Sequence, residues 1–205
     1  MLKNIIFDFG GVLLNIDFKR SFDAFEALGY LNFEDLFAQH HADDLFQRLE
    51  TSQIKVNEFY DKLALLAPNT VTHLQLQNAW NAMLINYRTR SIDFLKTLRK
   101  NYNIYLLSNT NEIHYNRFTQ MLQEETGHKK LEDFFDKAWF SHLIYLRKPD
   151  VETFKFVLSD AGINAEETLF IDDSFSNLPA AESVGMKTHL LKPGELIEHL
   201  DYSNY

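Results

Sequence analysis

The chain has 205 residues, of which 45% are hydrophobic and 24% charged, a composition typical of a globular protein with one sizeable core. Its net charge of −9 argues against binding to nucleic acid or to an anionic membrane surface, because Lys and Arg side chains make those contacts. The absence of cysteine excludes disulfides and thiolate metal sites and fits a cytoplasmic location.

The N-terminal segment predicts a buried strand that ends in a turn. Residues 5–7 are apolar and are followed by Asp8 and by the glycines Gly10 and Gly11, a pattern typical of a parallel strand and a tight turn. The apolar run is too short for a signal peptide, and no segment reaches the ~18 apolar residues of a membrane span. We therefore expect no membrane partner.

Residues 16–91 have a different pattern, because apolar residues recur at helical spacings and strand patterns are almost absent. The residues at these spacings are Phe22, Phe25, Leu28, Leu36, Phe37, Phe59, Leu63, Leu66, Leu74, Leu76, Trp80 and Leu84. The block predicts three to four amphipathic helices.

The rest of the chain alternates between helical and strand patterns. Helices are predicted at residues 92–99, 112–124, 150–161 and 178–184, and strands at 104–107, 137–141, 169–171 and 187–191. This alternation is typical of a parallel sheet covered by helices on both faces. We therefore predict an α/β core of residues 1–15 and 92–205, with residues 16–91 inserted as an all-helical cap.

Polar residues follow three of the predicted strands, where ligands bind in parallel sheets. Asp8 follows the first strand, Ser108 and Asn109 follow the second, and Asp172 and Asp173 follow a third. Two adjacent carboxylates after a buried strand repel each other, and a hard cation such as Mg²⁺ relieves that repulsion. The pair therefore indicates a metal site more strongly than an exposed turn.

Each of the other residues also has an ordinary explanation. Asp8 alone is as typical of a turn, and Ser108 and Asn109 of a helix N-cap. Lys148 precedes Pro149, which fits the first turn of a helix, and a solvated surface lysine is the usual case. The eight histidines, including the neighbours His40 and His41, show no metal-ligand spacing and have no predicted role.

Taken together and in this order, the residues resemble four motifs of the haloacid dehalogenase superfamily. The motifs occupy residues 5–13, 106–109, 147–149 and 170–174, with Asn177 after the last. The resemblance extends over nearly the whole chain and is greatest to the sugar-phosphatase-like subgroup. It implies a Rossmann-like core with an inserted helical cap, and a Mg²⁺-dependent phosphatase that acts on a small phosphorylated metabolite.

The resemblance also implies a role for each site residue. Asp8 would be the nucleophile that forms an aspartyl-phosphate, with Ser108 and Lys148 as the other catalytic residues. The implied Mg²⁺ ligands are Asp8, the Gly10 carbonyl and Asp173, with Asp172 bound directly or through water. The implied phosphoryl-binding residues are Gly11, Ser108, Asn109 and Lys148.

One position departs from the family pattern. Many of its phosphatases carry a second aspartate two residues after the nucleophile, as a general acid and base, and this chain has Gly10 there. Asp17, near the start of the predicted cap, is a candidate for that role. Two alternatives follow: a non-catalytic protein that binds a phosphorylated metabolite, and a 2-haloacid dehalogenase, against which the Asp172-Asp173 pair argues. Nothing in the sequence predicts an oligomeric state.

Overall fold

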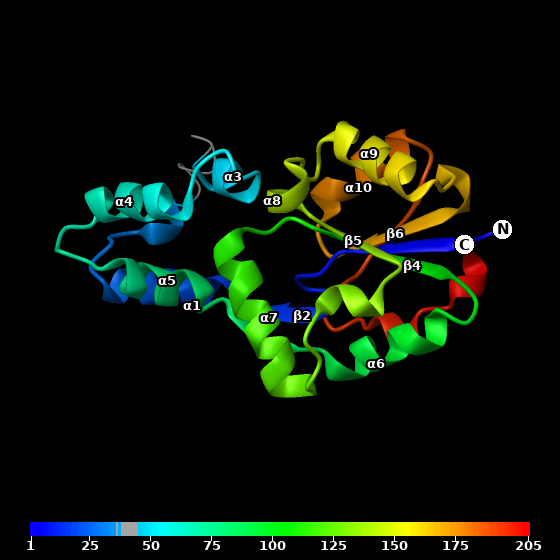
Figure 1. Cartoon of the computed structure of the whole chain (residues 1–205), viewed down its shortest axis with the longest axis horizontal. Coiled ribbons are helices and arrows are strands. Elements are labelled where there is room, and N and C mark those ends of the chain that lie inside the picture. Colours follow the sequence, from blue (N-terminus) through cyan, green and yellow to red (C-terminus); the bar gives the residue numbers. More distant parts are fainter. Residues whose placement is uncertain (36, 38–44) are drawn as a thin grey trace.

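The computed structural model describes residues 1–35, 37 and 45–205, and in it the chain forms an α/β body with a helical lobe at one end (Figure 1). The predictions made for Leu36, His40 and His41 lie outside the described residues. The N-terminus and the C-terminus both lie at the end of the body away from the lobe (Figure 1). No described helix is long and apolar enough to cross a bilayer.

A five-stranded parallel sheet forms the centre of the body. Its order is β5 (Lys137–Phe140), β4 (Asn103–Ser108), β1 (Asn4–Phe7), β6 (Thr168–Asp172) and β7 (Lys187–Leu190). The first strand of the chain is thus the middle strand of the sheet. The predicted parallel sheet is confirmed, and the ends of β1, β4 and β6 meet at one edge.

Helices cover both faces of the sheet (Figure 1). The helices α6 (Thr89–Leu98) and α7 (Glu112–Thr126) lie on one face, and α9 (Val151–Ala161) and α10 (Leu178–Ser183) lie on the other. Ile5 and Phe7 of β1 pack into the first layer, whereas Ile6 packs into the second. All three are fully buried, which explains why this strand is apolar without alternation.

Shorter elements complete the body. They are α8 (Ser141–Ile144) and the 3₁₀ turns η1 (Leu131–Phe134), η2 (Ala165–Glu167), η3 (Phe175–Asn177), η4 (Ile197–His199) and η5 (Tyr202–Asn204). Pro149 does not open a helix as predicted, because α9 begins two residues later with Asp150 as its N-cap. The Lys148–Pro149 peptide bond is cis.

The lobe consists of helices that enclose an aromatic core. Its helices include α1 (Phe18–Ala27), α3 (Leu45–Glu50), α4 (Val56–Leu66) and α5 (His73–Asn81). Phe25 and Phe33 stack with ring centroids 3.9 Å apart, and Trp80 packs against Phe46 at 5.1 Å. The periodic aromatic residues are therefore core residues, as their spacing predicts.

An antiparallel ribbon, which was not predicted, connects the lobe to the body. Its strands are β2 (Leu14–Ile16) and β3 (Leu84–Tyr87). The helical prediction at Leu84 was wrong, because α5 ends at Asn81 and Leu84 pairs with Ile16. A partner so distant in the sequence leaves no trace in local periodicity.

Candidate active site

Three carboxylates meet at the edge of the sheet where β1 and β6 end. Asp8 follows β1, Asp172 ends β6, and Asp173 comes next. One oxygen from each of them lies within 4.8 Å of the other two. Asp8 and Asp172 are buried, and Asp173 is exposed. The sheet thus brings together the acids that the sequence places 164 residues apart.

Lys148 lies beneath this cluster and is 1% exposed. Its Nζ donates to Oδ1 of Asp8 at 2.5 Å and to Oδ2 of Asp172 at 2.8 Å. Burial lowers the pKa of Lys148, but the attraction of the two carboxylates outweighs it and raises the pKa above its usual value. The alternative of a solvated surface lysine is wrong.

Asp172 is the most heavily hydrogen-bonded acid of the three. Besides Lys148, it accepts from Nδ2 of Asn177 at 2.9 Å and from the backbone N–H of Ser174 at 2.7 Å. Both of its oxygens therefore already have protein donors. Asp8 and Asp173 are the acids better placed to bind a cation.

The electrostatics of the cluster suit a divalent cation. Burial raises the pKa of Asp8 to about 7, and the Asp172 and Asp173 carboxylates add to that effect while Lys148 opposes it. The pKa of Asp173 is also raised, by loss of solvent around its carboxyl group and by Asp172. A hard cation with oxygen ligands relieves both the desolvation and the repulsion.

The glycine turn after Asp8 leaves space for this cluster. Gly11 has a φ of 72°, and a Cβ added there would overlap the carboxylate of Asp173. Its N–H donates to the carbonyl of Leu14 at 2.8 Å. Gly11 therefore contributes room beside the acids, while its N–H is already engaged within the turn.

Ser108 ends β4 and Asn109 follows it beside the cluster, and neither residue caps a helix. The N-cap of α7 is Asn111, so the helix-cap reading of Ser108 and Asn109 was wrong. Asn109 instead donates through Nδ2 to the carbonyl of Lys148 at 2.8 Å and accepts from the Lys148 N–H at 2.9 Å. The Asn109 side chain thus binds both the carbonyl and the N–H of Lys148. The sequence does not reveal this role.

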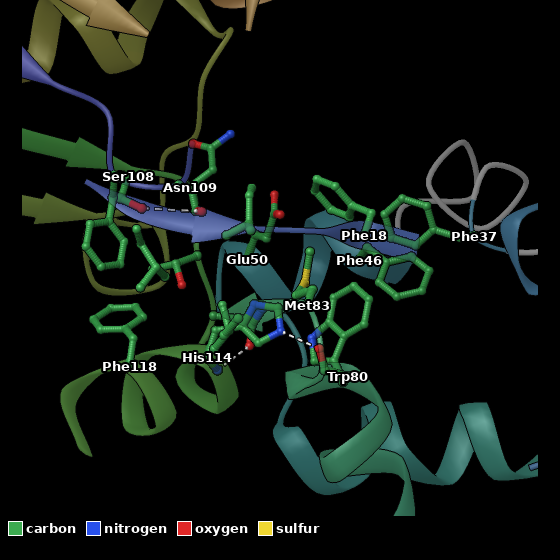
Figure 2. A pocket seen from close by; sticks show the side chains of 17 residues that line it. Phe18, Phe37, Phe46, Glu50, Trp80, Met83, Ser108, Asn109, His114 and Phe118 are labelled. Carbon is green, nitrogen blue, oxygen red and sulfur yellow. Dashed lines mark hydrogen bonds between the residues drawn. The ribbon is translucent and has the colours of Figure 1, made fainter. Parts of the chain in front are cut away.

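A cavity of about 220 Å³ extends from these loops to the lobe (Figure 2). Its lining includes Gly10, Ser108 and Asn109 on the side of the body, and Trp80 and Glu50 on the side of the lobe. Asp17 does not line it. That carboxylate is exposed and accepts from the N–H of Lys19 at the start of α1, so it functions as a helix cap.

His114 is a cavity residue that the sequence analysis missed. Its Nε2 lies 3.1 Å from the carbonyl oxygen of Trp80 and its Nδ1 lies 3.3 Å from Nδ2 of Asn111. The ring also stacks on Trp80 with centroids 4.9 Å apart (Figure 2). Helix α7 of the body is thereby joined to α5 of the lobe. No local pattern separates such a histidine from a surface one.

Because burial lowers the pKa of His114 to about 4, we expect the protein to lose stability as the pH falls from about 6.5 towards 4. In that range His114 takes up a proton in the unfolded chain but not in the folded one. The free energy of unfolding should therefore fall by about 2 kcal/mol between pH 7 and pH 5. His114→Gln should weaken this dependence, and urea unfolding at both pH values measures it. His142, whose pKa burial also lowers to about 4, should account for part of what is left.

Exposed His128 provides the control, since His128→Gln should change the pH dependence less than His114→Gln does. If the free energy of unfolding fell equally between pH 7 and pH 5 in the wild type and in His114→Gln, the prediction would be contradicted.

The chain is similar to known proteins over most of its length. The family described as haloacid dehalogenase-like hydrolase matches residues 2–185. The D-ribitol-5-phosphate phosphatase of Bacteroides thetaiotaomicron is 34% identical over 188 residues, which are 92% of this chain and 91% of that protein.

The chain is also similar in structure to solved proteins over most of its length. A HAD family enzyme from Bacteroides thetaiotaomicron, in complex with magnesium and inorganic phosphate, superposes with a TM-score of 0.86 at 36% identity, covering 100% of this chain and 98% of that one. A predicted HAD-like family hydrolase from Porphyromonas gingivalis superposes with a TM-score of 0.85 at 31% identity, covering 95% and 93%.

Proposed function

The chain belongs to the haloacid dehalogenase-like hydrolases and acts on phosphoric monoesters, and from this we propose a Mg²⁺-dependent phosphatase that forms an aspartyl-phosphate on Asp8. The substrate in this proposal is a small phosphorylated metabolite, and a sugar or polyol phosphate is the first to test, given the D-ribitol-5-phosphate phosphatase relative. A cytoplasmic location and the absence of a nucleic-acid partner stay predictions.

The observation that carries the proposal is the ion pair between Asp8 and fully buried Lys148. Lys148 holds one oxygen of Asp8 and so fixes the direction of the carboxylate. In the proposed reaction, Asp8 attacks phosphorus and the bond from phosphorus to the ester oxygen breaks. Water then attacks the acyl-phosphate, which releases inorganic phosphate and restores Asp8.

The acids fit Mg²⁺, which relatives of the same fold bind. Its proposed ligands are Asp8, Asp173 and the carbonyl oxygen of Gly10, whereas Asp172, whose oxygens face Lys148 and Asn177, would orient Lys148 and act on the metal through water. When bound, Mg²⁺ supplies positive charge that offsets the repulsion between the phosphoryl group and Asp8.

Ser108 and Lys148 are proposed to bind the phosphoryl oxygens. Ser108 is 2% exposed at the end of β4, and among the described residues its Oγ makes only a long contact of 3.5 Å with the Asn109 carbonyl. It is therefore available to donate to an anion. Asn109 is proposed to keep the ammonium group of Lys148 in place, because its side chain hydrogen-bonds to the Lys148 backbone.

The proton for the leaving group is proposed to come from water, because Gly10 has no side chain and Asp17 lies outside the cavity. The loss of a general acid is typically worth about 10² to 10⁴ in rate. This same feature motivates the second candidate, a protein that binds a phosphorylated metabolite without turning it over. Dehalogenation is not favoured, because the acid cluster suits a metal that this reaction does not need.

We expect the protein to release inorganic phosphate from at least one member of a panel of sugar, polyol and alkyl monophosphates when Mg²⁺ is present. A chelator should stop the release and added Mg²⁺ should restore it, because the acids repel the substrate without the cation. Binding of a phosphate ester, measured by calorimetry, without release from any of them would favour the second candidate.

A further inference from the structure

We propose that the organic group of the substrate is compact and largely apolar, of the size of a pentyl or benzyl group, and that it packs against aromatic rings of the lobe. This inference rests on the phosphatase function proposed above and narrows its substrate class. It departs from the polyol phosphate that the relative's name suggests.

The position of the organic group follows from the loops after β1 and β4, which line the cavity and also lie beside the acid cluster. Gly10, Ser108 and Asn109 line the end of the cavity near the body, where the phosphoryl group is proposed to bind. The ester oxygen must point away from Asp8 for in-line attack. The rest of the substrate therefore extends towards the lobe.

The lining on that side is mainly apolar (Figure 2). The apolar residues towards the lobe are Phe18, Phe37, Phe46, Trp80, Met83 and Leu84. Phe37 packs against Phe46 with ring centroids 4.6 Å apart and against Phe18 at 6.3 Å. Because Phe18 is 45% exposed, its ring still has apolar surface that a ligand can cover.

Several polar side chains of the described lining have protein partners, whereas the buried indole N–H of Trp80 has none. Asn109 binds the Lys148 backbone, Asn111 caps α7, and both ring nitrogens of His114 have polar neighbours. Glu50 forms an ion pair with Arg147, with its Oε2 2.9 Å from Nε. A chain of several hydroxyl groups would leave water for a wall whose unpaired indole N–H, on Trp80, can bond to only one of them, and the unpaired hydroxyls lower affinity.

The volume is sufficient for a group of this size. A cavity of about 220 Å³ equals the liquid volume of about seven water molecules. A five-carbon chain or a benzyl group fits this space beside the phosphoryl site.

The test compares two esters that share a five-carbon chain with phosphate on a primary carbon, n-pentyl phosphate and D-ribitol 5-phosphate. With Mg²⁺ present, we expect kcat/KM to be at least about tenfold higher for pentyl phosphate, the scale of discrimination that an apolar pocket provides. Benzyl phosphate should resemble pentyl phosphate. Equal values, or a preference for the ribitol ester, would overturn the inference and leave the phosphatase function intact.

A variant locates the effect in the cavity. Phe18→Ser should lower kcat/KM for pentyl phosphate about tenfold and change that for ribitol 5-phosphate much less. The matched control is Leu74→Ser, because Leu74 is an exposed apolar residue of α5 that does not line the cavity. An equal loss of kcat/KM on both esters would overturn the inference. If the wild type released phosphate from no ester at all, the proposed phosphatase function itself would be contradicted.

Discussion

Asp8→Asn is expected to lower phosphate release by about 10⁴-fold or more, the size of effect seen when a catalytic nucleophile is removed. The amide keeps the shape of the side chain but cannot attack phosphorus. It also removes a negative charge from the metal site, so the binding of Mg²⁺ should weaken. The rate of phosphate release at saturating Mg²⁺ and substrate measures the first effect, and calorimetry measures the second.

The matched control is Asp17→Asn, which makes the same chemical change in an exposed carboxylate. Asn caps a helix as well as Asp does, so α1 should keep its cap and activity should stay near that of the wild type. A large loss in Asp17→Asn would support its candidacy as the missing acid. Acid-quenched wild-type protein should carry one phosphoryl group by mass spectrometry, and Asp8→Asn should not. Turnover that survives in Asp8→Asn would exclude this residue as the nucleophile.

The order of strands and helices in the body was predictable because each element carries its own local pattern. Ile5, Ile6 and Phe7 are apolar because both faces of β1 are covered, and the later strands are marked by the helices between them. The ribbon of β2 and β3 was not predictable, because Leu84 continues the helical spacing of α5 and its true partner is Ile16. Only the folded structure shows that Leu84 pairs with Ile16.

The acid cluster was predictable for a different reason. A parallel sheet directs all its strand ends to one edge, so Asp8 and Asp172 had to be neighbours if β1 and β6 were. The burial of Lys148 was not predictable from its sequence neighbours, because Arg147 and Asp150 are charged and Pro149 carries no apolar strand pattern. The contacts of Asn109 with the Lys148 backbone and of His114 with Trp80 depend on loop geometry, which no local spacing records.

Lys148→Met is expected to lower kcat by about 10³-fold, because removal of one preorganised charge partner of the reacting group typically costs 10²- to 10³-fold. Methionine has nearly the length of lysine and no charge, so it fills the buried space without pairing Asp8 or Asp172. Mg²⁺ should bind the variant at least as tightly as the wild type, because a cation beside the acids has been removed. Calorimetry of Mg²⁺ binding beside the rate of phosphate release separates these two expectations.

The same substitution should also destabilise the fold. Lys148 is the cation that two buried acids share, and breaking a buried ion pair from one side typically costs about 3–5 kcal/mol. Urea unfolding in the presence of a chelator measures this loss, and saturating Mg²⁺ should restore part of it by binding the folded state alone. Lys155→Met is the matched control, since Lys155 pairs with Glu152 on the exposed face of α9 and such pairs contribute about 0–1 kcal/mol. If Lys148→Met unfolds like Lys155→Met and keeps wild-type kcat, Lys148 neither supports the acid cluster nor binds the phosphoryl group.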